Sequence, residues 1–249
     1  MRVVAMFLGL LVIAAAIAGF APASLVDARL ASISHGAVRV SEAQGTLWQG
    51  QGVMTSPDGQ WRMPVAWTLH PLPLLSGVTA ITLGMPEDAA QGVRGSVEFR
   101  SNRAAADSLI ARVPASAVAS KSGPLAIKAG GDVDLRIDAL SLAPSGSSGG
   151  VSAQWRNARV VGTGWPVLEL GTLNAKLAVR GNALAGPVSN QGGAVRISGD
   201  NSIGADRINA DLRLHADATA TPAVRAALEA LGPADASGAV ALRVDRSTR

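Results

Sequence analysis

Cysteine and tyrosine are absent from this chain of 249 residues, and aromatic residues make up only 3% of it. Without cysteine, the protein can form no disulfide, no thiolate metal site and no cysteine nucleophile. Charged residues are also scarce, at 16%, whereas hydrophobic residues reach 48%. This composition excludes a disordered chain, whose signature is low hydrophobicity with high charge, and the length leaves room for one large or two modest domains.

The chain also lacks a basic cluster, although its net charge is +4. Its arginines and lysines are scattered singly along the sequence. Nucleic-acid binding requires a clustered basic stripe, usually with aromatic side chains that stack on bases. We therefore expect no nucleic-acid partner.

Residues that could perform catalysis are few. His35, His70 and His215 are isolated and lack the spacing of metal ligands. The segment 146–150 formally matches the G-x-S-x-G motif of hydrolases, but it lies in a Ser/Gly-rich loop, whereas the motif acts on a strand-to-helix turn. We expect no catalytic residue, no cofactor and no metal site, and hence no enzyme.

The first segment is apolar. Residues 3–23 carry no charge, and as a helix they would extend about 31 Å, close to the thickness of a bilayer core. We predict a transmembrane signal-anchor over residues 1–23, with Arg2 on the cytoplasmic side and residues 24–249 in the periplasm. Cleavage is the alternative, because Ala21-Pro22-Ala23 has the small-x-small form of a signal-peptide site.

The remainder of the chain alternates apolar and polar residues with period two. Val133, Leu135 and Ile137 fall on one face of such a segment, and charged residues fall on the other. This pattern is typical of antiparallel sheet with one face in water. It predicts a mainly β fold of roughly ten to fourteen strands. The segments with this pattern are 61–69, 132–138, 173–179, 208–214 and 240–244. Further strands are expected around 36–42, 93–99, 124–129, 151–161 and 193–199.

Three segments interrupt the alternation. Ala104–Val113 and Pro222–Leu231 are rich in alanine and leucine, and we predict two short helices there. The second has proline in its first turn after Thr221 and a Gly-Pro stop. Pro144–Gly150, rich in serine and glycine, is expected to be a hinge or a long turn.

Two stretches resemble signatures of the type II secretion system protein N (general secretion pathway protein N) family. The segment 45–50, GTLWQG, is similar to the family's G-T-[LV]-W-x-G, and 67–77, WTLHPLPLLSG, is similar to its W-x-L-x-P-x-x-L-L-x-G. Residues 187–194, PVSNQGGA, match a third family element more weakly. The candidate interaction residues are Gly45, Thr46, Leu47, Trp48, Gly50, Trp67, Pro71, Leu74, Leu75 and Gly77.

The resemblance implies an accessory inner-membrane component that supports export of folded periplasmic proteins by contacting other secretion subunits. It implies one transmembrane helix, no enzymatic activity and, through a likeness to AsmA-like proteins, a large curved antiparallel sheet. The groove of such a sheet suggests a second hypothesis, the binding of lipid or another hydrophobic ligand. An open trough lined by Leu135, Ile137, Leu177 and Leu212 would favour lipid binding. A sheet closed over these residues would exclude lipid binding.

The same stretches also have a direct physical interpretation. Glycines in 45–50 allow a tight turn, and we expect a strand to end at Pro71. The leucines that follow, Leu72, Leu74 and Leu75, are expected to plug the end of the sheet. Trp48, Trp61 and Trp67 are expected to nucleate a core in a chain with few aromatics.

Overall fold

The computed structural model describes residues 21–247, apart from 58, 60, 86–88, 119–127, 145, 163–164, 182 and 205–206. Most of the predicted anchor, residues 1–20, therefore lies outside the described residues, as does most of the strand expected at 124–129. Within the described part of the chain, no helix is both long and apolar enough to cross a bilayer.

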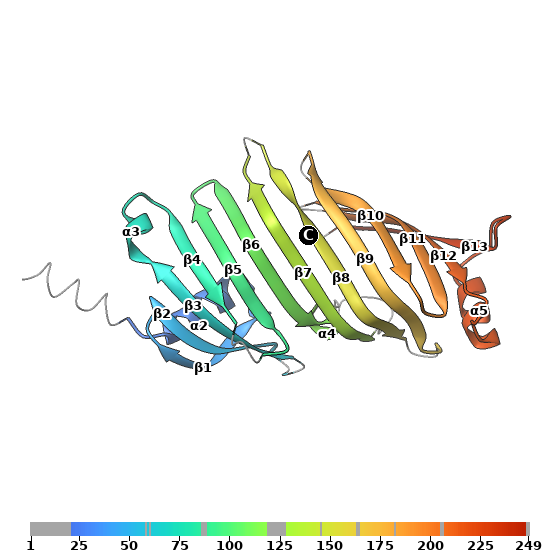
Figure 1. Cartoon of the computed structure of the whole chain (residues 1–249), viewed down its shortest axis with the longest axis horizontal. Coiled ribbons are helices and arrows are strands. Elements are labelled where there is room, and N and C mark those ends of the chain that lie inside the picture. Colours follow the sequence, from blue (N-terminus) through green and yellow to red (C-terminus); the bar gives the residue numbers. More distant parts are fainter. Residues whose placement is uncertain are drawn as a thin grey trace, which may run out of the picture. The chain divides into compact units, whose positions relative to one another are not determined.

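Antiparallel strands dominate the described residues. Thirteen of them follow one another in the sheet in sequence order, β1 to β13 (Figure 1). The prediction of a mainly β, antiparallel architecture is confirmed. The chain divides into two compact units, Met1–Arg100 and Ser101–Arg249, which are described separately.

The first unit has a small core beside its N-terminal helix. Ala23, Val40, Val65 and Trp67 are buried together, and Leu30 packs against them. Because Val65 and Trp67 are two residues apart on one strand, both point to this core. The elements of the unit are α2 (Ser24–Ile33), β1 (Arg39–Gly45), β2 (Gln49–Thr55), β3 (Arg62–His70), α3 (Pro71–Leu74), β4 (Thr79–Gly84) and β5 (Gly92–Arg100).

An ion pair ties α2 to β1 in this unit. The Arg39 guanidinium donates to both carboxylate oxygens of Asp27, at 2.9 and 2.6 Å, and the Val40 N–H donates to Asp27 Oδ1 at 2.8 Å. These hydrogen bonds hold the pKa of Asp27 below its ordinary value, and the bond from Arg39 has the largest effect. The stabilisation that these bonds give the folded state is therefore fully present at a pH above the ordinary pKa of Asp27. It is lost as the pH falls through the lowered pKa.

The second unit contains the larger core. Alternate residues of its strands, including Leu170, Val195 and Leu214, are buried beneath Val224 and Leu228 of a helix. The elements of the unit are β6 (Arg103–Pro114), α4 (Ala115–Val118), β7 (Lys128–Leu142), β8 (Ser148–Val161), β9 (Leu168–Arg180), β10 (Ala183–Gln191), β11 (Val195–Gly204), β12 (Arg207–Ala216), α5 (Pro222–Glu229) and β13 (Ala239–Ser247).

Helix α5 confirms one of the two predicted helices. The Thr221 hydroxyl accepts a hydrogen bond from the Val224 N–H at 3.4 Å, as an N-cap residue does. Val224 and Leu228 are four residues apart, so they share one face of the helix and are buried together. The helix ends at Glu229, two residues before the predicted end.

The other predicted helix, Ala104–Val113, is wrong, because these residues lie in strand β6. The strand pairs with β7 from Ala104 opposite Leu142 to Pro114 opposite Asp132. Alanine has a high helix propensity, but propensity is a weak preference that tertiary pairing overrides. Here the backbone hydrogen bonds of a long antiparallel ladder take precedence.

The segment 144–150 joins β7 to β8. Ser141 pairs with Ser148 and Leu140 with Gly149, so the connection closes a hairpin. The boundary between the two compact units falls at residues 100 and 101.

Candidate functional site

The first family-like stretch forms the turn between β1 and β2. Gly45 has a φ of +92°, and a Cβ at this position would lie 2.5 Å from the Gln49 carbonyl oxygen. The Thr46 N–H donates to that oxygen at 2.8 Å, and the Gln49 N–H donates to Thr46 Oγ1 at 3.2 Å. The predicted tight turn therefore depends on glycine at position 45.

Trp67, from the second stretch, closes over this turn. Its side chain is only 6% exposed, and its Nε1–H points at the carbonyl oxygens of Thr46 and Leu47, at 3.3 and 3.2 Å. Gly50 pairs with Trp67 across β2 and β3, and a Cβ on Gly50 would lie 2.6 Å from the ring atom Cζ2. The two stretches, about twenty residues apart in sequence, thus form one interlocked structure.

The chain enters the folded unit beside the same turn. The Leu47 N–H donates to the Ala21 carbonyl oxygen at 2.8 Å, and Pro22 forms an isolated bridge with Thr46. Ala23 is 2% exposed and belongs to the core. The Leu69 N–H donates to the Trp48 carbonyl oxygen at 2.7 Å. We call this region, residues 21–23, 45–50 and 67–77, the motif end of the first unit.

The rest of the second stretch connects β3 to β4. Pro71 begins α3, and Gly77, with a φ of +72°, ends the connection. The expectation that Leu72, Leu74 and Leu75 plug the sheet is wrong, because they are 77%, 37% and 88% exposed. The last strand pair is His70 with Ala80, and α3 follows β3 beyond this pair (Figure 1). Val78 is buried in their place.

The three tryptophans differ in burial. Trp67 is buried, as expected of a core residue, whereas Trp48 and Trp61 are only partly buried. The core role therefore applies fully to Trp67 alone.

The third family-like stretch contains a polar residue that the sequence analysis missed. Asn190 Nδ2 donates to the carbonyl oxygens of Leu170 and Val195, at 2.7 and 2.6 Å, and Oδ1 accepts from the Ile197 N–H at 2.6 Å. One side chain thereby joins β9, β10 and β11. The sequence indicates this role only through position: Asn190 is two residues after Val188, so a polar side chain stands on the face of the strand where an apolar one is expected.

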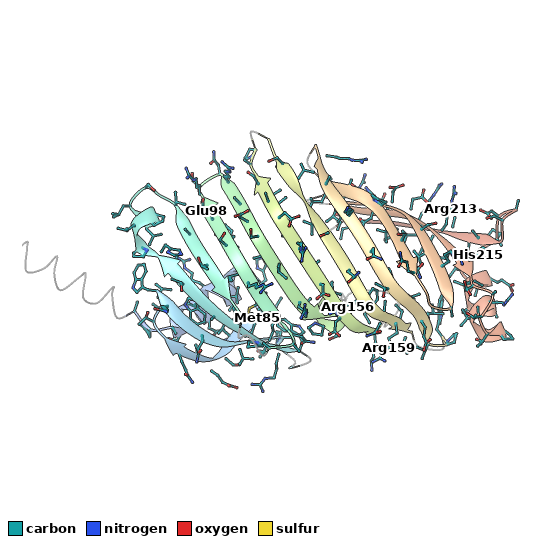
Figure 2. All side chains as sticks on the ribbon, in the orientation of Figure 1. Met85, Glu98, Arg156, Arg159, Arg213 and His215 are labelled. Atoms are coloured by element: carbon teal, nitrogen blue, oxygen red, sulfur yellow. The ribbon has the colours of Figure 1, made fainter. Side chains whose placement is uncertain are left out.

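A shallow hollow of about 540 Å³ lies on the polar face of the second unit. Asp134 forms ion pairs with two guanidinium groups, and Arg112 Nε and Arg156 Nε each lie 2.8 Å from one of its carboxylate oxygens (Figure 2 labels Arg156). Of the four residues proposed to line a lipid trough, only Leu135 contributes to this hollow. Leu177 is buried, and Leu212 packs against the core beneath α5, so the lipid hypothesis stays a prediction.

The groups weighed for catalysis lie in ordinary structural settings. His70 is exposed, and its Nε2 lies 2.9 Å from Thr82 Oγ1. Ser148 begins β8 in a hairpin, which is not the strand-to-helix turn of a hydrolase. In the described part of the chain, no three His, Asp or Glu side chains are grouped so that they could hold a metal ion.

Comparison with known families relates these residues to one described family. A family model described as type II secretion system (T2SS), protein N matches residues 36–243. The matched range includes the Gly45–Gly50 turn, Trp67, the exposed leucines and Asn190. No curated protein and no solved structure matches the chain.

Proposed function

The chain belongs to the type II secretion system protein N family, and from this premise we propose that it is an accessory inner-membrane component of that system. In this role it supports the export of folded periplasmic proteins through contacts with other secretion subunits. The family match over residues 36–243 carries the proposal. The two most specific sequence motifs support it, because they fold together as one structure.

The proposed location follows from the apolar N-terminal segment. Residues 21–23 belong to the folded unit, so the segment left for the bilayer is residues 3–20, which as a helix would extend about 27 Å, close to the thickness of a bilayer core. The single charge before this segment, Arg2, favours retention of the N-terminus in the cytoplasm. The sheet units would then lie in the periplasm. A cysteine-free chain is compatible with that oxidising compartment.

The proposed mechanism involves binding and no chemical step. The second unit offers a long sheet face with alternating exposed polar side chains, among them Gln154, Lys176 and Arg213. Polar, exposed sheet faces suit reversible contacts between folded subunits better than they suit burial in an obligate core. We therefore assign the contacts with other subunits to exposed surfaces of this kind.

Photocrosslinking in living cells tests this proposal. A photoreactive amino acid at Gln154 or Arg213, both exposed, is expected to capture other type II secretion subunits, as identified by mass spectrometry. The same amino acid at Val195, which is buried, is the matched control and should capture none. Capture of lipid alone at the exposed positions would contradict a protein-contact role and would favour the groove hypothesis.

A further inference from the structure

Three leucines of the β3–β4 connection are left uncovered in the first unit. Leu72 and Leu75 are among the most exposed large apolar side chains of the described residues, and Leu74 lies beside them. The sequence from Met63 to Pro86 contains no Asp, Glu, Lys or Arg. Single exposed leucines are common on soluble proteins, but a group of three in a stretch without charge marks a contact surface.

The backbone of this connection is largely satisfied internally. Pro71 and Pro73 have no N–H group. The N–H groups of residues 75–78 donate to carbonyl oxygens at 72–74, at 3.0–3.1 Å, and Ser76 Oγ donates to the Pro73 oxygen at 2.8 Å. A bilayer has few groups that can replace lost hydrogen bonds, so a segment entering it must satisfy its own backbone. The N–H groups of residues 75–78 meet that requirement.

The leucines lie at the end of the sheet where the chain enters the unit. Hydrogen bonds join Ala21 to Leu47 and Trp48 to Leu69, and Leu69 lies two residues before the start of α3. Phe99 of β5, 46% exposed, pairs with Thr79 at this same end. Glu98, labelled in Figure 2, is its charged neighbour on the opposite face of β5. The apolar segment before Ala21 therefore joins the unit at the end that carries these exposed apolar side chains.

We propose that the motif end of the first unit docks on the surface of the lipid bilayer, with Leu72, Leu74 and Leu75 inserted at the interface. The inference rests on the proposed anchor, since a bilayer entered by the apolar residues before Ala21 would lie beside this end. Lipid is favoured over a protein partner because the exposed β3–β4 connection, residues 71–77, carries no charged side chain. The short four-residue helix α3 then fixes the unit at a second point beside the anchor, which gives the unit a defined orientation on the membrane.

A dye attached to single cysteines tests the insertion, and the chain has no native cysteine to remove. We would place an environment-sensitive dye at Leu75→Cys in the full chain, reconstituted in phosphatidylethanolamine–phosphatidylglycerol vesicles with lipid-borne quenchers. Pro57→Cys is the control, because Pro57 is exposed at the opposite end of the first unit. Ile13→Cys reports on the anchor itself.

Insertion predicts a blue-shifted, strongly quenched dye at Leu75, and a water-exposed, unquenched dye at Pro57. Quenching at Ile13 with none at Leu75 would overturn the docking and leave the anchor in place. Absence of quenching at both would overturn the anchor and the docking together. Leu75→Ser should fold normally because the side chain is exposed, and should weaken quenching of a dye at Leu72→Cys; unchanged quenching would argue against insertion.

Discussion

Replacement of Trp67 by alanine is expected to lower the free energy of unfolding of the first unit by about 3–5 kcal/mol. The indole is buried in the small core of that unit, and its removal leaves a cavity between Val65 and Gly50. The change also removes the donor that faces the Thr46 and Leu47 carbonyl oxygens. Denaturant unfolding followed by circular dichroism measures the loss.

Two further variants identify the cause. Trp61→Ala is the matched control, since Trp61 is only partly buried and its replacement should cost much less. Trp67→Phe keeps part of the ring and loses the two Nε1 contacts, so its cost should fall between the two. Equal destabilisation by Trp67→Ala and Trp61→Ala would contradict the interlocked turn.

Replacement of Asn190 by alanine is expected to destabilise the second unit by about 3 kcal/mol, because several buried backbone groups lose their partner at once. The carbonyl oxygens of Leu170 and Val195 and the N–H of Ile197 would be left without this side chain. Thermal unfolding of the full chain measures the effect, and the transition that shifts should be that of the second unit.

Asn190→Asp separates hydrogen bonding from packing at this position. The substitution conserves the size of the side chain and retains an acceptor for the Ile197 N–H, but it replaces the donor by a carboxylate oxygen facing two carbonyl oxygens. It should therefore be at least as destabilising as alanine at neutral pH. Ser189→Ala, at the exposed neighbouring position, should have little effect. A tolerated aspartate would refute the donor role of Asn190.

The sheet could be predicted from the sequence because its strands expose one face. The alternation of Val133, Leu135 and Ile137 lies in β7, and that of residues 208–214 lies in β12. Such alternation identifies a half-buried strand without knowledge of its neighbours. The error at Ala104–Val113 has the complementary cause: its composition favours a helix, and only the ladder with β7 decides for a strand.

The site could be predicted only in part. The turn at Gly45 follows from local backbone chemistry, since glycine tolerates a positive φ. The contact between Gly50 and Trp67 depends on the register of β2 against β3, which the sequence does not specify by itself. The exposure of Leu72 and Leu75 was likewise hidden, because an apolar side chain is usually assigned to the core.

The register also explains why glycine is required at position 50 opposite Trp67. A side chain at Gly50 would collide with the Trp67 ring and with the Gln44 carbonyl oxygen, each 2.6 Å from the added carbon. The turn that Trp67 closes holds Ala21 through Leu47. The motifs thus position the point at which the N-terminal segment meets the folded unit.

Thiol labelling in intact cells tests most directly the claim on which both proposals depend, that the sheet lies on the periplasmic side of the inner membrane. The chain lacks cysteine, so a Val167→Cys variant has a single thiol. Val167 is 50% exposed, so this thiol is accessible to the reagent. The account predicts labelling by a membrane-impermeant maleimide when the outer membrane is permeabilised and the inner membrane is intact. Labelling only after the inner membrane is broken would contradict it.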